Sequence, residues 1–122
     1  SYVPRGIDLA KLKEFSEPNY GHRFFVDGPI VTSTTRELTG QTVLVGTLGR
    51  GGRGLYALDV SNPTTFATNR VLWDHDASFD TDMGQILGRP LIAKLNDGSV
   101  GVLVPNGLNS TSERAVLFVV DL

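Results

Sequence analysis

The chain has 122 residues, of which 40% are hydrophobic, and a formal net charge of −2. This near balance of charge gives no general attraction to nucleic acid or to an anionic membrane, and the absence of cysteine excludes disulfides, thiol catalysis and cysteine-bound metals. The apolar content suffices for a modest core, while no apolar run approaches the ~20 residues of a membrane-spanning helix.

One short helix is predicted near the start of the chain. Asp8 can cap a helix over residues 9–15, and Ile7 can pack against Leu12 across that cap. Pro18 prevents much continuation, so the helix is expected to have about two turns. Its apolar side chains are expected to fasten it to the first sheet: Leu9, Leu12 and Phe15 or Phe24.

Two β-rich stretches of the chain repeat one another. Pro29 and Pro90 are 61 positions apart, and Asp59 and Asp121 are 62 positions apart. A recurring offset of this kind indicates a repeat architecture. Alternating apolar runs between turn residues predict four strands in the first unit, over residues 29–33, 42–48, 55–60 and 70–74, and three in the second, over residues 87–92, 101–105 and 116–122.

A repeating unit of four strands is typical of a β-propeller blade, so an all-β fold is predicted. We expect an N-terminal segment with the short helix (1–25), a first blade (26–76) and a second, incomplete blade (77–122) that lacks its fourth strand. Because a propeller needs about four or more blades to hide its sheet edges, the chain is expected to be a fragment of a larger protein.

Several uncommon strings carry a resemblance to a known family. Residues 1–5 read SYVPR, residues 17–28 read EPNYGHRFFVDG, and residues 43–60 read VLVGTLGRGGRGLYALDV. Together with Leu72 and Trp73, these strings closely resemble the C-terminal β-propeller of the PilC/PilY family, the tip-associated adhesins and biogenesis factors of bacterial type IV pili. The resemblance spans essentially the whole chain, in order, and only a part of such a protein.

This resemblance implies a modified quinoprotein-like propeller of about seven blades, exported through the periplasm and associated with the outer membrane and the pilus tip. It implies a protein that is not an enzyme, that promotes pilus extension by opposing retraction, and that supports surface attachment. The implied partners are pilins or minor pilins and, for some members, the host-cell surface. Nucleic acid is not among them, and membrane association would come through partners rather than through a transmembrane span.

Calcium binding is known in several members of the resembled family, in an Asp-x-Asp-x-Asp loop shortly after a strand like the one that ends at Leu122. That loop is not in this sequence. Any calcium site that the resemblance implies would therefore lie elsewhere in the parent protein, and no cofactor is expected in this segment. No catalytic, cofactor-binding or metal-binding residue is nominated.

The string of residues 49–54 fits the dinucleotide-binding pattern G-x-G-x-x-G. That site requires a helix after the glycines to hold the pyrophosphate, whereas residues 55–60 are predicted to form a strand. We therefore interpret the glycines as a hairpin between two blade strands and Arg50 and Arg53 as solvated charges.

An acidic cluster follows the fourth predicted strand, formed by Asp74, Asp76, Asp80 and Asp82. Calcium takes several closely spaced oxygen ligands, but no glutamate closes a calcium loop here. The favoured interpretation is a loop in which aspartates cap turns by accepting bonds from nearby amides.

The remaining polar and aromatic signals favour structural roles. His22 and His75 are too few for a metal site, and His22 is interpreted as a structural hydrogen-bonding residue. Trp73 is typical of packing between blades, with a cofactor platform as the alternative. The sequon 109–111 is expected at an exposed hairpin tip.

Two alternative functions stay open: a quinoprotein-like propeller enzyme and a calcium-stabilised structural module. The segments expected to make contacts are 34–40, 50–53, 61–69 and 106–114.

Overall fold

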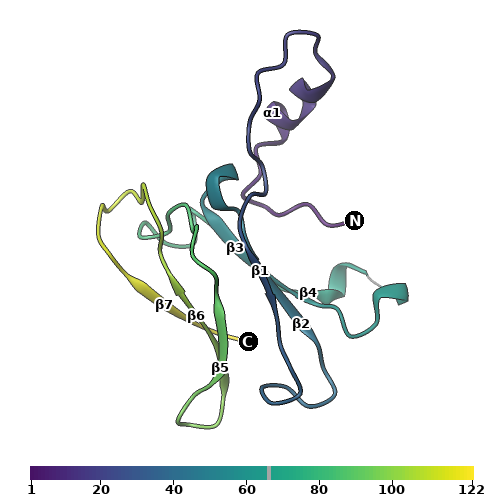
Figure 1. The fold of residues 1–122 in the computed structure, drawn as a ribbon, viewed down its shortest axis with the longest axis vertical. Helices are drawn as coiled ribbons and strands as arrows, with labels where there is room; N and C mark the ends of the chain where they lie inside the picture. The colour runs from purple at the N-terminus through teal and green to yellow at the C-terminus, as the bar shows by residue number, and fades with distance from the viewer. Residues whose placement is uncertain (66) are drawn as a thin grey trace.

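Two antiparallel sheets make up most of the structure, a computed structural model that describes residues 1–65 and 67–122 (Figure 1). In each sheet every strand pairs with its neighbour in the chain. The first sheet contains β1 (Ile30–Thr32), β2 (Val43–Thr47), β3 (Gly54–Asp59) and β4 (Val71–Asp76), and the second contains β5 (Leu91–Lys94), β6 (Val100–Pro105) and β7 (Leu117–Asp121). The predicted all-β fold is confirmed.

Strand β5 differs from its predicted range of 87–92. It begins at Leu91, directly after Pro90, because proline has no N–H to donate to the strand ladder. Gln85 forms only an isolated bridge, to Leu108. Strand β4 extends beyond the predicted residue 74, and Asp76 at its end pairs with Gly54.

The main core lies between the two sheets. Val45 and Ala57 of the first sheet and Val102 and Val104 of the second are fully buried, together with Ile86 from the connection between the sheets. Side chains on a strand alternate between its faces, so residues two apart, such as Val102 and Val104, enter the same core.

Two hydrogen bonds tie the first sheet to the second sheet and to the connection between them. The Thr47 hydroxyl donates to the Ile86 carbonyl at 3.0 Å, and the Trp73 indole Nε1 donates to the Asp121 carbonyl at 2.9 Å. Trp73 stands on β4 and Asp121 on β7, so the tryptophan spans both sheets. Trp73 therefore packs between the two sheets, which agrees with the prediction that it is a packing residue.

The opposite face of the first sheet is covered by the N-terminal residues. Tyr56 and Leu58 of β3 pack there against Tyr2 and Ile7, with the Tyr2 and Tyr56 ring centroids 5.4 Å apart. The Tyr2 hydroxyl donates to the Asp74 carboxylate, and burial together with this bond raises the pKa of Tyr2. Residues before the helix therefore fasten the N-terminal segment to the sheet.

The predicted helix forms, and its cap is confirmed. Helix α1 covers Leu9–Lys13 and continues as a 3-10 turn, η1, over Glu14–Ser16. One carboxylate oxygen of Asp8 accepts hydrogen bonds from the Ala10 and Lys11 amides, at 3.0 and 3.2 Å. The first amides of the helix are thereby satisfied.

The predicted packing of this helix on the first sheet is wrong. The helix lies in a segment that projects away from both sheets, here called the arm (residues 8–25; Figure 1). Leu9 and Phe15 in this arm are 58% and 55% exposed. Phe15 instead stacks on Tyr20 and packs at a tilt against Phe25, with ring centroids 4.6 and 5.1 Å away. These aromatic contacts hold the two ends of the arm's loop together. Among the described residues, no helix has the length and apolar character needed to cross a membrane.

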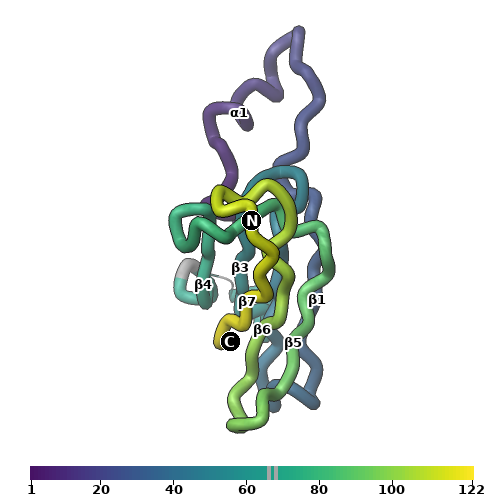
Figure 2. Tube along the Cα trace, turned by 90° about the vertical axis from the view of Figure 1, so that its left-hand side faces the viewer, coloured from purple at the N-terminus to yellow at the C-terminus, as the bar shows by residue number. Residues whose placement is uncertain are grey.

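The outward face of the second sheet is apolar and exposed. The second sheet lies in front in Figure 2. Leu91 of β5 and Leu117 and Val119 of β7 are each more than half exposed, and Leu91 and Val119 both pair with Leu103 on the central strand. The described residues leave these side chains exposed, whereas Val102 and Val104 on the other face of the sheet are fully buried.

Candidate functional site

Two loops meet at one end of the sheets, close to where the arm leaves the first sheet (Figure 1). They are the β2–β3 turn, residues 48–53, and the β6–β7 loop, residues 106–116, here called the paired loops. Arg53 Nη1 donates to Thr111 Oγ1 at 2.9 Å, and the Gln85 side chain joins both loops. Two predicted contact segments, 50–53 and 106–114, thus come together.

The other two predicted contact segments lie elsewhere. Segment 34–40 joins β1 to β2 at the opposite end of the first sheet (Figure 1). Segment 61–69 joins β3 to β4, and its position 66 lies outside the described residues. The paired loops are therefore the place where both sheets contribute predicted contact residues.

Glycine lets the β2–β3 turn approach the backbone of the arm. Gly49 has a φ of +55°, and a Cβ on Gly51 would lie 2.0 Å from the Phe25 carbonyl oxygen. A short 3-10 turn, η2 (Gly49–Gly51), precedes β3, so a strand and not a helix N-terminus follows the glycines. The predicted Gly-rich connection between two strands is confirmed.

The arginines of this turn make specific contacts in addition to their exposure to solvent. Arg50 places its guanidinium 5.5 Å from the centre of the Phe24 ring, within the range of a cation–π contact. Arg53 reaches the second sheet's loop through Thr111. Sequence reasoning missed both contacts because each partner is remote in the chain.

Asn106 holds the base of the β6–β7 loop. Its side chain is buried, donates to the carbonyls of Asp82 and Arg114 at 2.9 and 2.8 Å, and accepts from the Val116 amide at 3.0 Å. One amide side chain thus satisfies three backbone groups of two segments. The composition of the loop gives no signal of this, since asparagine is common in any turn.

The sequon 109–111 sits at the tip of this loop but is only partly exposed. Asn109 and Thr111 are exposed, whereas Ser110 is 7% exposed. Asn109 and Glu113 have φ angles of +58° and +56°, which cost a non-glycine residue about 1 kcal/mol each. The tip is exposed at Asn109 and Thr111, as predicted, and Ser110 between them is buried.

An ion pair fixes the other side of the loop. Arg114 donates from Nη2 to both carboxylate oxygens of Asp82, each at 3.1 Å. The Ser112 side chain, followed by the Arg114 guanidinium, holds the pKa of Asp82 below its ordinary value of 3.8. The side chain of Asp82 is 13% exposed and that of Arg114 is 69% exposed, so solvent screens the pair from one side only.

Replacing Asp82 with asparagine is expected to destabilise the protein at pH 7 and to have little effect at pH 2. Because the folded-state pKa of Asp82 is lowered, its stabilising contribution is present above the unfolded value, near 3.8, and disappears as the pH falls through the lower folded value. Urea unfolding of wild type and Asp82→Asn between pH 2 and pH 7 measures this. Asp121→Asn, at an exposed carboxylate, is the control. A difference that stayed constant over this range would contradict the expectation.

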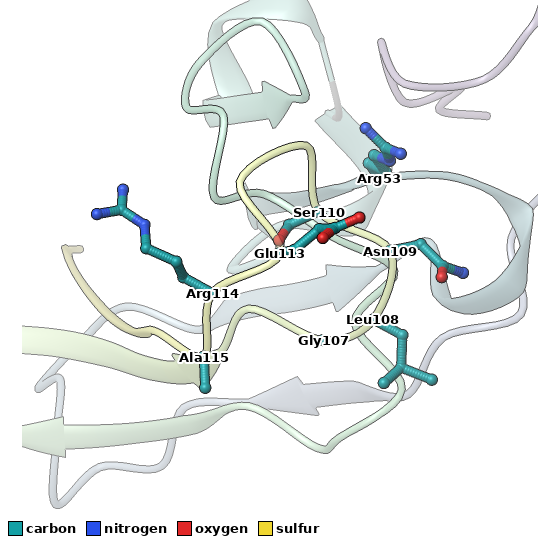
Figure 3. Close-up of a pocket in the computed structure, with 8 residues that line it drawn as sticks. All are labelled: Arg53, Gly107, Leu108, Asn109, Ser110, Glu113, Arg114 and Ala115. Carbon is teal, nitrogen blue, oxygen red and sulfur yellow. The ribbon is translucent and has the colours of Figure 1, made fainter.

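A pocket of about 550 Å³ opens beside the paired loops (Figure 3). Arg53 of the first sheet's turn forms one part of the wall, and Glu113 points to the same side as Arg53, whereas Arg114 points away. The lining contains no aromatic residue and consists of Arg53, Gly107, Leu108, Asn109, Ser110, Glu113, Arg114 and Ala115. The site therefore offers charges of both signs and amide groups to a polar ligand.

The four aspartates of the acidic cluster have separate partners. Asp76 accepts from the Ser78 amide at 2.8 Å and Asp80 from the Asp82 amide at 2.7 Å, which confirms their predicted turn-capping role. Asp74 instead accepts from Tyr2 and from the Arg5 amide, and Asp82 from Arg114. Within the part of the chain that the structure describes, no three His, Cys, Asp or Glu side chains are grouped to hold a metal.

The two histidines have aromatic neighbours. The ring of His75 stacks between Trp73 and Phe79, with centroids 5.2 and 3.8 Å away, and burial lowers the pKa of His75. His22 packs edge-on against Phe24 at 4.9 Å. Within residues 1–65 and 67–122, His22 makes this ring contact and not the predicted side-chain hydrogen bond.

Comparisons with known proteins cover almost the entire chain. The family model described as the PilY1 beta-propeller domain matches residues 6–122. A "Type IV pilus biogenesis factor PilY1 homolog" of Xylella fastidiosa (strain Temecula1 / ATCC 700964) is 43% identical over the whole chain, which covers 10% of that protein. The "Type IV pilus biogenesis factor PilY1" of Pseudomonas aeruginosa (strain UCBPP-PA14) is 38% identical over the whole chain, with the same 10% covered.

A solved structure shows the same arrangement of strands. The crystal structure of the Pseudomonas aeruginosa PilY1 C-terminal domain matches 99% of the chain with a TM-score of 0.72 and 31% sequence identity. The match uses 23% of that structure's chain. The present chain thus spans about a tenth of the length of the curated relatives and about a quarter of the solved domain.

Proposed function

This chain belongs to the PilY1 β-propeller family, and from that membership we propose that it forms part of a type IV pilus biogenesis factor. The observation that supports this most is the family match over residues 6–122, together with relatives of that name at 33–43% identity over the full chain. The function proposed is that of the whole protein, to which this chain contributes.

Residues 26–76 and 77–122 act as two blades of a larger propeller, with residues 1–25 as the segment that precedes them. The apolar outward face of the second sheet supports this assignment. A neighbouring blade that covered Leu91, Leu117 and Val119 would remove their apolar surface from water, at about 25 cal/mol for each Å² buried. The same packing already exists between the first and second sheets.

The protein promotes pilus extension and surface attachment through protein–protein contacts, with pilins or minor pilins and, at the cell surface, host structures as its partners. The paired loops support a contact role, because Asn106, the Asp82–Arg114 pair and the Arg53–Thr111 bond hold them in one conformation. The site of action is the exported, envelope-associated pilus machinery, including the pilus tip.

An enzymatic role is the alternative, and the geometry favours it less. One face of the Trp73 ring is stacked on the His75 ring, with the centroids 5.2 Å apart, and the glycines of residues 49–54 lead into β3 rather than into a helix N-terminus. These contacts give quinone or dinucleotide binding little support. A calcium-stabilised module would need ligands beyond the separately partnered aspartates of this chain.

Deletion of the gene that carries this chain tests the proposal in the source cells. We expect the loss of surface pili, measured by electron microscopy and by pilin in the sheared fraction, with recovery upon complementation. If the protein opposes retraction, removing the retraction motor in the deletion strain is expected to restore pili. Unchanged piliation in the deletion strain would contradict the proposed function.

A further inference from the structure

We propose that the pocket beside the paired loops binds a peptide segment of a partner protein, with the Arg53 guanidinium pairing with a carboxylate of that segment. This inference rests on the proposed function only in taking the partner to be a protein. The pocket, of about 550 Å³, falls within the roughly 300–1,000 Å³ of ligand-binding clefts.

Arg53 is the cation of the pocket that is available to a ligand. Arg114 already donates to both carboxylate oxygens of Asp82. Arg53 donates from Nη1 to the Thr111 hydroxyl and pairs with no carboxylate among the described residues. A guanidinium has five N–H donors in a planar fork that matches a carboxylate, so most of its donors remain for a ligand.

The composition of the wall selects a peptide over other anionic ligands. Glu113 lies in the same wall and would repel a uniform polyanion such as nucleic acid. The lining has no aromatic ring on which a base or a sugar would stack. Leu108 is 59% exposed and offers an apolar contact, while Asn109 offers amide hydrogen bonds of the kind that peptide backbones use.

The pocket is held ready for a ligand before binding. Asn109 and Glu113 keep left-handed backbone conformations, which persist only where the surroundings fix them. Asn106 and the Asp82–Arg114 pair provide that support. A loop that is already ordered loses little conformational entropy on binding, which favours affinity from a small number of contacts.

The test uses the full-length protein that carries this chain and a phage-displayed library of random heptapeptides. Selected peptides are synthesised in two forms, with the acidic residue or with its amide, and their affinities are measured by fluorescence anisotropy. We expect the selected peptides to share a carboxylate, and we expect its amide form to bind about tenfold more weakly.

Three variants locate the carboxylate contact. Arg53→Gln is expected to weaken the acidic peptide about tenfold and to leave the amide form unchanged, because the pair is already absent there. Thr111→Val removes the internal bond of Arg53 but keeps the cation, and it is expected to retain binding. Arg36→Gln, at an exposed arginine of the β1–β2 connection, is the matched control and is expected to have no effect.

Two results would overturn the inference. One is equal affinity of wild type and Arg53→Gln for the acidic peptides, and the other is equal affinity of wild type for the acidic and the amide forms. If deletion of the gene still abolishes piliation while Arg53→Gln leaves peptide affinity unchanged, the inference fails and the proposed function stands. If piliation is unaffected by the deletion but Arg53-dependent peptide binding is found, the proposed function fails alone.

Discussion

Replacement of Gly51 with alanine is expected to destabilise the protein by about 3 kcal/mol or more. The new Cβ would lie 2.0 Å from the Phe25 carbonyl oxygen and 2.1 Å from its carbonyl carbon. Both are backbone atoms, so no side-chain rotation can relieve the overlap, and either the β2–β3 turn or the arm must move. Overpacking at a tight site costs up to about 3 kcal/mol, and here the contact also sets the position of the arm.

Thermal and urea unfolding of the purified variant measure this effect. Gly21→Ala is the matched control, because a Cβ at Gly21 would meet nothing within 4 Å and this glycine also lies in the arm. Limited proteolysis between residues 8 and 25 reports whether the arm has been displaced. Equal stability of Gly51→Ala and Gly21→Ala would show that the close approach of the turn to Phe25 does not constrain the fold.

Replacement of Asn106 with leucine is expected to cost about 3 kcal/mol and to loosen the paired loops. The leucine has a similar size but cannot satisfy the carbonyls of Asp82 and Arg114 or the amide of Val116. Each buried polar group left without a partner costs about 1–3 kcal/mol, although water can reach some of them once the loop opens. Asn106 is 3% exposed in the intact structure.

Amide hydrogen exchange separates a local effect from a global one. The exchange rate at Val116 is expected to rise in Asn106→Leu more than the rates in β2 and β3, because the lost bonds belong to the β6–β7 loop. Asn96→Leu, at an exposed turn between β5 and β6, is the control for adding an apolar side chain. Unchanged exchange at Val116 would mean that Asn106 does not hold the loop.

Both variants also bear on the proposed peptide site. The glycine contact positions the turn that carries Arg53, and Asn106 positions the loop that carries Glu113. Arg53 and Glu113 come from different sheets, so the pocket exists only while both supports are intact. Weaker binding in these variants would follow from altered geometry, whereas weaker binding in Arg53→Gln follows from the lost cation itself.

The sequence was a good guide wherever structure depends on residues close together in the chain. Alternation of apolar residues, with glycine and proline between them, located the seven strands of the described residues to within a few positions. The cap at Asp8 and the turns at Asp76 and Asp80 involve amides two or three positions away. Such interactions are visible in a local pattern because chain connectivity alone brings the partners together.

The sequence was a poor guide to interactions between distant residues. The apolar residues of the helix predicted that it packs on the first sheet, but Phe15 contacts Tyr20 and Phe25 in the same arm. Arg53 appeared solvated, although its partner Thr111 lies 58 positions away. The neighbouring residues in the sequence are the same whether a side chain is exposed to water or contacts a loop that is remote in the chain.

By itself, then, the sequence determined the all-β class, the repeat of two related sheets, the position of the strands and the resemblance to the PilC/PilY family, because these follow from periodicity and from local strings of residues. Only the tertiary structure decided that Trp73 joins the two sheets, that the arm stands apart, and that Arg53 and Glu113 share one pocket. These features depend on how the two sheets pack. Packing is set by the combined shape of many side chains across the interface, so no single stretch of sequence contains it.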